Sequence, residues 1–318
     1  MKNLATYFSI LTTVALILAL NALPAAAQVS EKNLKKHISF LSTDKMKGRG
    51  TGSKEVAKAA NYIQKQFKKY GLTPKGEHSY RQSFTAKVRR VVVADSIRQA
   101  DNVIGYIDNQ APYTIVIGAH YDHLGTGHQG SSKDSLGVGK IHNGADDNAS
   151  GVAGLLELAR IYATNEIQES FNLLFIAFGA EELGLVGSRY FTENPTIPLE
   201  SIHWMLNMDM IGRYNSDNGV AVIGYGTSSK FPVIFEGITS DIRFNLSKDG
   251  NGGSDQTSFY RKNIPVLFFH TGGHEDYHMP TDDEHKINYP GLMSILELEI
   301  KVLNNSMKQD KMDFQWTN

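Results

Sequence analysis

Residues 114–122 read Thr-Ile-Val-Ile-Gly-Ala-His-Tyr-Asp, an apolar run that ends in a histidine and a carboxylate. A continuous apolar run is typical of a strand in a sheet covered on both faces. His120 then lies at the rim of that sheet, where α/β enzymes place their chemistry. Asp122 follows two residues later and can hydrogen-bond the second imidazole nitrogen, which would fix the tautomer of His120. A His-x-Asp sequence alone is usually a coincidence, so other segments must support it.

Similar apolar runs recur along the chain. The further predicted strands are Asn102–Ile107, Asn172–Phe178, His203–Met208, Pro265–Phe269 and, less regular, Val220–Tyr225. The predicted helices are 31–42, 53–70, Ala149–Ala163, Leu183–Phe191, Lys230–Thr239 and Pro290–Asn304. Strands that alternate with helices predict an α/β fold. We expect a single-domain three-layer sandwich, with a mixed, mostly parallel central sheet and helices on both faces.

The N-terminus is typical of an export signal. Lys2 precedes an apolar run from Leu4 to Leu20, and three alanines at 25–27 give a small-residue cleavage pattern. We interpret residues 1–27 as a signal peptide and 28–318 as one catalytic domain of an exported protein, periplasmic or extracellular. No stable membrane span is then expected after cleavage. An uncleaved anchor is the alternative, because about 20 apolar residues can cross a bilayer.

Composition excludes several classes of chemistry. The chain has no cysteine, so thiol nucleophiles and cysteine-based zinc sites are excluded, and any metal site must use His, Asp and Glu. Its net charge is −1 and it has no basic stripe, so no nucleic-acid partner is expected. The oligomeric state cannot be predicted from these features.

The glycine-flanked segment 144–151, Gly-Ala-Asp-Asp-Asn-Ala-Ser-Gly, carries Asp147 just before a predicted helix. A carboxylate in such a turn can present both oxygens outward and bridge two cations. The alternative is a capping role, because Asp and Asn are favoured at the starts of helices.

Three further polar segments each follow an apolar run. In the pair Glu181-Glu182 one side chain can bind a metal while the other acts as a general base, although acids are also favoured in the first turn of a helix. Asp209 ends a strand, where a buried carboxylate is costly unless it is paired or metal-bound. His278 lies in a polar loop after the last predicted strand.

Six other histidines lie near these segments in the sequence. We interpret each as shaping a loop, with His274 the strongest competitor for the role of His278: His123, His128, His142, His270, His274 and His285.

Together, the segments resemble the motifs of the M28 family of zinc aminopeptidases. The matching residues are His120-Tyr121-Asp122, Gly144 to Gly151, Ala180-Glu181-Glu182, Asn207-Met208-Asp209 and His278-Met279-Pro280-Thr281-Asp282. The resemblance implies two zinc ions per chain, one bound by His120 and Asp209, the other by Glu182 and His278, with Asp147 bridging them. Mn²⁺ and Co²⁺ tolerate the same ligands.

The resemblance also implies roles for the remaining residues. Glu181 would be the general acid/base, Asp122 would orient His120, and the peptide bond after Asp147 is cis in some members. The implied activity is removal of N-terminal residues from peptides with a free N-terminus, through a metal-bridged water. Alternatives are a carboxypeptidase or amide deacylase, a glutaminyl cyclase-like enzyme with one zinc ion, and a non-catalytic binding relative.

Two departures from the family pattern bear on the substrate. Gln256 stands where members often have histidine, and it cannot become cationic. Larger relatives insert a protease-associated domain before the His-x-Asp strand, whereas the gap from 84 to 102 is too short for one. Selectivity must then come from local loops, with Phe259, Tyr260 and Tyr277 as candidate pocket walls or, equally, as core residues.

Overall fold

A nine-stranded mixed sheet forms the centre of the molecule in this computed structural model, which describes residues 28–317. The strands are β1 (Thr73–Pro74), β2 (Arg81–Lys87), β3 (Ile97–Ile107), β4 (Thr114–His120), β5 (Asn172–Phe178), β6 (Ile202–Met208), β7 (Val220–Ile223), β8 (Phe244–Ser247) and β9 (Val266–His270). Their order is β1-β3-β5-β4-β6-β9-β7-β8, and β2 pairs with β3. The central strands β5, β4, β6 and β9 are parallel, whereas β3 and β7 flank them in antiparallel orientation.

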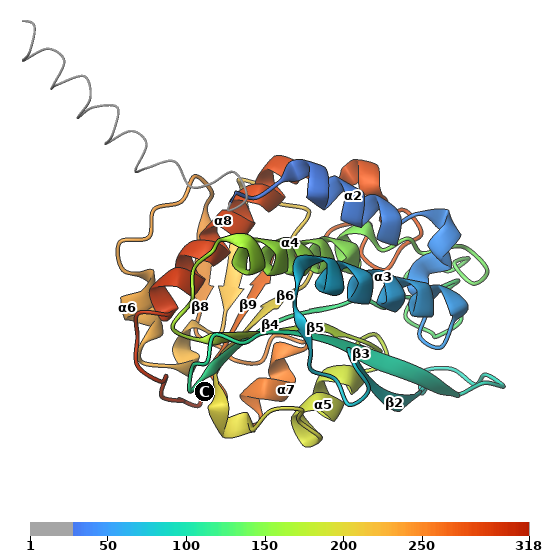
Figure 1. Cartoon of the computed structure of the whole chain (residues 1–318). Coiled ribbons are helices and arrows are strands. Elements are labelled where there is room, and N and C mark those ends of the chain that lie inside the picture. Colours follow the sequence, from blue (N-terminus) through green and yellow to red (C-terminus); the bar gives the residue numbers. More distant parts are fainter. Residues whose placement is uncertain (1–27, 318) are drawn as a thin grey trace, which may run out of the picture.

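Helices cover both faces of the sheet (Figure 1). One face carries α2 (Glu31–Leu41), α3 (Lys54–Tyr70), α4 (Gly151–Thr164) and α8 (Tyr289–Ser306), and the other carries α5 (Val186–Glu193) and α7 (Gln256–Tyr260). Side chains alternate between the two layers: Ile115 and Ile117 enter one core and Val116 the other. Every residue of β4, β5 and β6 is buried as a result. The predicted α/β sandwich is confirmed, while the interpreted signal peptide 1–27 lies outside the described residues.

Two capped helices hold the segment that precedes the site. Ser30 accepts a hydrogen bond from the backbone of Asn33 at the start of α2, and Ser53 accepts one from Val56 at the start of α3. Gly71 ends α3 with a φ of 85°, a left-handed conformation that glycine adopts without steric cost. Both helices pack against α4, so residues 42–53 between them are fixed at both ends.

Some predicted boundaries were wrong. The helix expected over 230–239 is only α6 (Phe231–Phe235), because Glu236 is extended and Gly237 has a φ of 72°. The helix expected from Leu183 begins at Val186, after Leu185 adopts a left-handed φ of 56°. β2 was missed, although its buried and exposed positions alternate. It forms with β3 a hairpin that projects from the molecule (Figure 1).

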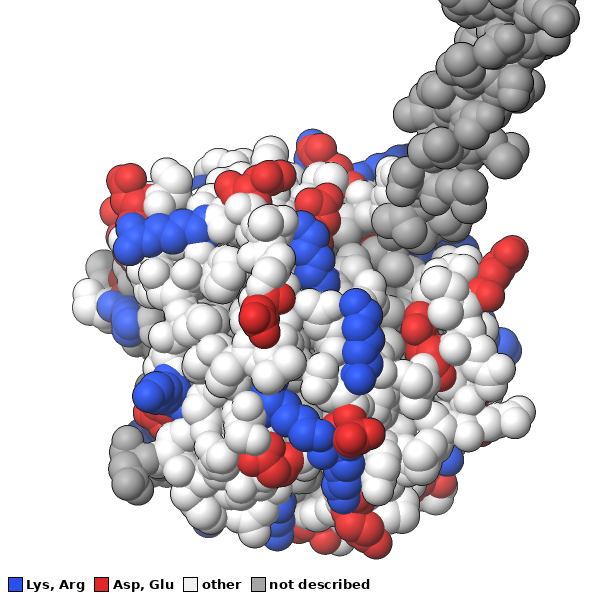
Figure 2. Space-filling view, turned by 90° about the vertical axis from the view of Figure 1, so that its left-hand side faces the viewer, with Lys and Arg blue, Asp and Glu red and all other residues white. Residues whose placement is uncertain are grey.

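The described surface mixes both signs of charge. On the face shown in Figure 2, acidic and basic side chains are interspersed rather than gathered by sign. None of the helices within residues 28–317 is long and apolar enough to cross a membrane.

Candidate metal centre

The carboxyl ends of three parallel strands bring the predicted site residues together. His120 ends β4 and pairs in register with Phe178, which ends β5 three residues before Glu181. On the other side of β4, Gly118 pairs with Asn207 of β6, which places Asp209 beside His120. The sheet itself therefore fixes the spacing between these segments.

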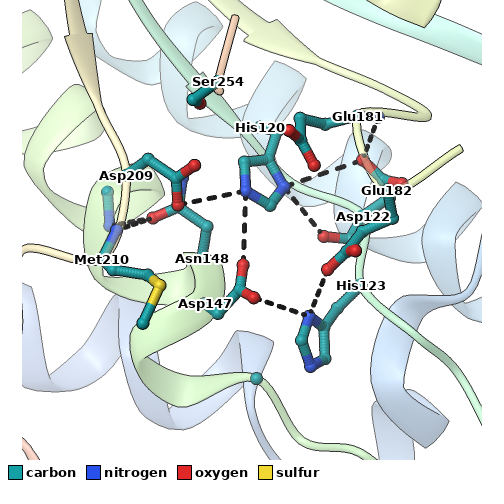
Figure 3. A network of polar contacts seen from close by, with 12 residues as sticks. His120, Asp122, His123, Asp147, Asn148, Glu181, Glu182, Asp209, Met210 and Ser254 are labelled. Atoms are coloured by element: carbon teal, nitrogen blue, oxygen red, sulfur yellow. Dashed lines mark hydrogen bonds and ion pairs between the residues drawn. The ribbon is translucent and has the colours of Figure 1, made fainter. Parts of the chain in front are cut away.

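A first group of side chains surrounds the Nε2 atom of His120. This atom lies 3.3 Å from Oδ1 of Asp147 and 3.3 Å from Oδ1 of Asp209 (Figure 3). On the other side of the ring, Nδ1 lies 3.2 Å from the backbone oxygen of Asp122. A carbonyl oxygen can only accept, so Nδ1 carries the proton and Nε2 is left with a lone pair for a metal.

The carboxylate of Asp122 has different partners from those expected. Its Oδ1 lies 3.8 Å from Nδ1 of His120, beyond hydrogen-bond distance, so the backbone carbonyl orients the ring instead. The carboxylate accepts hydrogen bonds from the backbone N–H of Glu181 at 3.0 Å and from the hydroxyl of Thr51 at 2.9 Å. Asp122 thus contacts both the His120 ring and the backbone of Glu181.

A second group surrounds the other oxygen of Asp147. The Nε2 atom of His278 lies 3.2 Å from Oδ2 of Asp147 and 3.3 Å from Oε2 of Glu182. The Nδ1 atom of His278 donates to the backbone oxygen of Ser131 at 2.9 Å, which again leaves Nε2 with a lone pair. Asp147 therefore offers one oxygen to each group, and its peptide bond to Asn148 is cis, as expected.

The spacing of these atoms fits zinc. Two atoms bound at about 2.1 Å to one tetrahedral zinc ion lie roughly 3.4 Å apart. The nitrogen–oxygen distances in both groups, 3.2–3.3 Å, match this value. Nitrogen and carboxylate oxygen are also donors that zinc accepts, so the residues present fit two such ions.

His123 is a member of the cluster that sequence reasoning did not find. Its Nδ1 lies 2.9 Å from Oε1 of Glu182 and 3.7 Å from Oδ2 of Asp147. The shorter distance is that of an ordinary N–H···O hydrogen bond, so His123 contacts the carboxylate of Glu182. The interpretation of His123 as a loop-shaping residue did not anticipate this contact, which arises because the chain turns after Asp122 and directs this ring to the cluster.

Charges in the cluster shift the pKa values of its members. Burial opposes the charge on Asp147, but the three histidines around it outweigh burial and hold the pKa of that carboxyl well below its usual range. Burial raises the pKa of Glu181 well above its usual value, and the neighbouring carboxylates of Glu182 and Asp209 add to this effect. Divalent cations at the cluster would oppose this second shift.

Two groups of described side chains lie close enough to share an ion, namely His120, Asp147 and Asp209, and His123, Asp147 and Glu182. The ring of His278 also lies 3.2 Å from Asp147 and 3.3 Å from Glu182.

His274, His270 and His142 belong to neither of these groups. His274 contacts Oδ2 of Asp146 at 3.1 Å and so supports the segment before Asp147 rather than replacing His278. His270 donates from Nδ1 to the backbone oxygen of Asp209 at 2.8 Å. His142 hydrogen-bonds Ser132 within its own loop.

A cavity of about 220 Å³ opens onto the cluster. Its lining residues are His120, Asp147, Glu181, Asp209, Met210, Gly252, Gly253, Ser254, Phe268, His270, Gly273, Tyr277 and His278. Of the three candidate walls, Tyr277 lines the cavity, whereas Phe259 and Tyr260 of α7 are buried in the core. Gln256 is also fully buried, with its amide against that of Asn207.

An α/β sandwich that gathers histidines and carboxylates at the carboxyl ends of its parallel strands defines the class of α/β metallohydrolases. Within that class, the sequence model of a protein family described as "Peptidase family M28" matches residues 102–303. The chain belongs to peptidase family M28.

Similar curated proteins include an aminopeptidase. The chain is 28% identical over 250 residues to leupeptin-inactivating enzyme 1 of Streptomyces exfoliatus, covering 78% of this chain but 51% of that protein. It is 27% identical over 212 residues to aminopeptidase YwaD of Bacillus subtilis, covering 63% of this chain and 42% of that protein. The chain thus spans about half the length of these relatives or less.

Solved structures share the fold. A leucine aminopeptidase precursor from Bacteroides thetaiotaomicron superposes with a TM-score of 0.68 at 19% identity, covering 89% of this chain and 99% of that one. A glutaminyl cyclase from the same organism gives the same TM-score, identity and coverage. The fold therefore serves more than one activity, and side chains must discriminate between them.

Proposed function

We propose that this chain is an exported aminopeptidase that uses two zinc ions. The observation that carries the proposal is the pair of ligand groups that share Asp147. His120 and Asp209 would hold one ion with one oxygen of Asp147, and Glu182 and His278 the other ion with its second oxygen. When bound, such a metal pair supplies Lewis acidity and lowers the pKa of a water held between the ions.

Glu181 is placed to move the proton. Its side chain lines the cavity beside Asp147 and Asp209, and its backbone is held by the carboxylate of Asp122. A buried carboxylate with a raised pKa can accept a proton from the attacking water and return it to the departing amine. Tyr277 lines the same cavity, where its hydroxyl is a candidate hydrogen-bond donor to the substrate.

The lining of the cavity disfavours a substrate that ends in a free carboxylate. None of its described lining residues is Lys or Arg. A carboxypeptidase would need such a side-chain cation to pair with the C-terminus of its substrate. Asp147 and Asp209 would be neutralised by the zinc ions assigned to them, so they would not act as ionic partners of the substrate. The small volume of the cavity suits one residue at a chain end.

The discriminating experiment compares substrates on purified protein. A panel of aminoacyl-anilides and their N-acetylated counterparts is assayed with and without a chelator, together with an N-terminal glutaminyl peptide. We expect chelator-sensitive release from free-amine substrates alone. Preference for blocked substrates would support an amide deacylase, cyclisation without release would support a glutaminyl cyclase, and no chelator-sensitive turnover would refute the proposal.

Glu181→Gln tests the mechanism. General acid/base groups contribute about 10²–10⁴-fold to rates, so kcat should fall by that factor while zinc content stays that of the wild type. Glu193→Gln, an exposed change in α5, is the matched control. Full activity of Glu181→Gln with bound zinc would contradict the role assigned to Glu181.

Export is proposed from the N-terminal pattern alone. Mass spectrometry of the protein from the periplasm or medium of an expressing bacterium should give a mature N-terminus at Gln28. A product that keeps Met1 would instead support an anchor.

A further inference from the structure

Arg49 is a fully buried arginine that contacts only backbone oxygens. Its guanidinium donates to the carbonyls of Leu41 at 2.5 Å, Tyr121 at 3.0 Å, Asn143 at 2.7 Å and Gly144 at 3.0 Å. Its exposed fraction is 0%. Burying a cation without a paired carboxylate is costly, so its place in this fold calls for an explanation.

The nearest negative charges belong to the candidate metal centre. Burial lowers the pKa of Arg49 to about 10, while Asp147 and Asp122 favour its charged form. Arg49 is therefore still a cation at neutral pH. It lies behind the cluster as a permanent positive charge that does not compete for the ligand atoms.

Three of the four carbonyls that Arg49 holds lie in the two segments that carry candidate ligands, and the fourth belongs to Leu41 at the end of α2. Tyr121 stands between His120 and Asp122, and Gly144 begins the turn that ends at Asp147. These segments are 72 and 95 residues away from Arg49 in the sequence. One planar guanidinium thus sets the distance between the backbones of the His120 and Asp147 segments.

The backbone around Arg49 is held in an unusual conformation. Arg49 has a φ of 48°, in the left-handed region that residues other than glycine rarely adopt. Its carbonyl accepts from the N–H of His123, and the carbonyl of Gly48 accepts from Gly125. A Cβ on Gly48 would lie 2.4 Å from the oxygen of Gly125, so the two backbones touch. Such strain persists where the surroundings impose it, often at functional sites.

Thr51 extends the same contact to the proposed general base. Its hydroxyl donates to Oδ2 of Asp122 at 2.9 Å, and Oδ1 of Asp122 accepts from the N–H of Glu181 at 3.0 Å. The segment Gly48–Thr51 therefore contacts the segments of His120 and Asp147 directly, and it reaches Glu181 through Asp122. It lies outside residues 102–303, which carry the family match.

We propose that Gly48–Thr51 is a positioning element of the metal centre, in which Arg49 spaces the His120 and Asp147 segments and Thr51 fixes the carboxylate that holds Glu181. The proposal rests on the proposed zinc-dependent function. Arg49 and Thr51 are positioning residues because neither touches a ligand atom.

Arg49→Met tests the first part, with Arg49→Lys as the conservative variant. Arg160→Met is the matched control, because Arg160 donates to Glu157 and to the backbone oxygen of Gln28 at the far end of α4. Zinc affinity is measured by chelator competition, kcat and KM with the best anilide, and the folded fraction by thermal unfolding. Outer partners of metal ligands typically contribute 10–100-fold, so Arg49→Met should lose about that factor in zinc affinity and kcat, with partial recovery in Arg49→Lys. Arg160→Met should keep the zinc affinity and kcat of the wild type once both are corrected for the fraction of unfolded protein.

Thr51→Val and Thr51→Ser test the second part and remain informative if Arg49→Met does not fold. Valine has the shape of threonine without the hydroxyl, so kcat should fall about tenfold at unchanged KM, whereas serine should retain activity. Wild-type zinc affinity and kcat in Arg49→Met, or wild-type kcat in Thr51→Val, would overturn the inference. Wild-type protein that neither binds zinc nor hydrolyses the anilides would instead refute the proposed function.

Discussion

The two ligand groups are held in different ways. The strand-end group (His120, Asp147 and Asp209) takes two of its members from the ends of β4 and β6, so the hydrogen bonds of the sheet set their distance. The loop group (Glu182 and His278, with Asp147) depends on residues well beyond strand ends, since His278 lies eight residues after β9. In the loop group, side-chain contacts must therefore fix the positions of the ligands, as the hydrogen bonds of the sheet do in the strand-end group.

Asp276 provides those contacts for the loop of His278. Its carboxylate accepts from Lys286 at 2.5 Å, Thr281 at 2.6 Å and Arg213 at 2.8 Å. Burial opposes the charge on Asp276, but these donors outweigh it and hold its pKa well below the usual range. The sheet thus sets the distance between His120 and Asp209, whereas the loop of His278 depends on a few side-chain contacts.

Asp147→Asn should have the largest effect, because it removes the carboxylate common to both groups. Several kcal/mol of metal-dependent stabilisation would be lost, and each 1.4 kcal/mol is about tenfold in rate. We expect kcat/KM to fall by at least about 10³-fold. We also expect the variant to bind neither of the two zinc ions. The same change at Asp146, which faces His274 instead, should leave one or both ions bound. Two retained ions in Asp147→Asn would show that Asp147 does not bridge.

His120→Asn and His278→Asn should separate the two groups. Each variant should lose one zinc ion and keep the other, because each histidine contacts Asp147 through a different oxygen. Metal analysis after gel filtration gives the stoichiometry, and activity should fall about 10²-fold or more in both. Loss of both ions in either variant would mean that the groups do not fill independently.

Asp276→Asn should weaken the loop group alone. The amide keeps the shape of the side chain but loses the charge that pairs with Lys286 and Arg213. We expect affinity for one of two zinc ions to fall by about 10–100-fold, measured by chelator titration. The variant should also lose an acid-sensitive part of its stability, since a carboxyl with a lowered pKa stabilises the fold fully above its unfolded pKa of about 4 and loses that contribution as pH falls from there through the lower folded pKa. Equal weakening of both ions would contradict the division into groups.

Glu299→Gln should have the smallest effect and shows what a buried carboxylate does without cations. Glu299 lies in α8 with both oxygens unpaired among the described residues, and burial raises its pKa well above the usual value. A raised pKa means that stability is greatest below the unfolded pKa of about 4.3 and declines as pH rises towards the folded pKa. Glutamine removes that decline, so we expect a gain of about 1 kcal/mol at pH 8, roughly 2–4 °C in Tm, and no change in activity. A lower Tm at pH 8 would contradict this account.

Sequence alone could predict the strand-end group and most of the loop group. Each of the predicted ligands follows an apolar run, and parallel strands bring their carboxyl ends to one edge. The fold class and the proximity of His120, Asp147, Glu182, Asp209 and His278 are thus found as expected, while their roles as ligands stay predictions.

The supporting residues could not be predicted in this way. His123 enters the cluster because of the path of a loop, which no periodicity describes. Apart from Leu41, the hydrogen-bond partners of the Arg49 and Thr51 side chains lie 71–95 residues away in the sequence, so nothing local marks them. Asp122 contacts His120 as expected, but through its backbone oxygen, while its carboxylate accepts from Glu181 and Thr51, and only the geometry reveals this division.

The hairpin of β2 and β3 offers a place where a further domain could be inserted into such an enzyme. Its tip occupies the interval where larger relatives would carry an inserted domain, and Val92 there is fully exposed. Nearby, Arg90 donates to the hydroxyl of Ser131, whose carbonyl accepts from His278. Extra length in a surface loop costs only about 0.6 kcal/mol per doubling. A module inserted at Val92 would lie two residues from Arg90, which contacts the residue that holds His278, and could alter which substrates arrive without altering the catalytic residues.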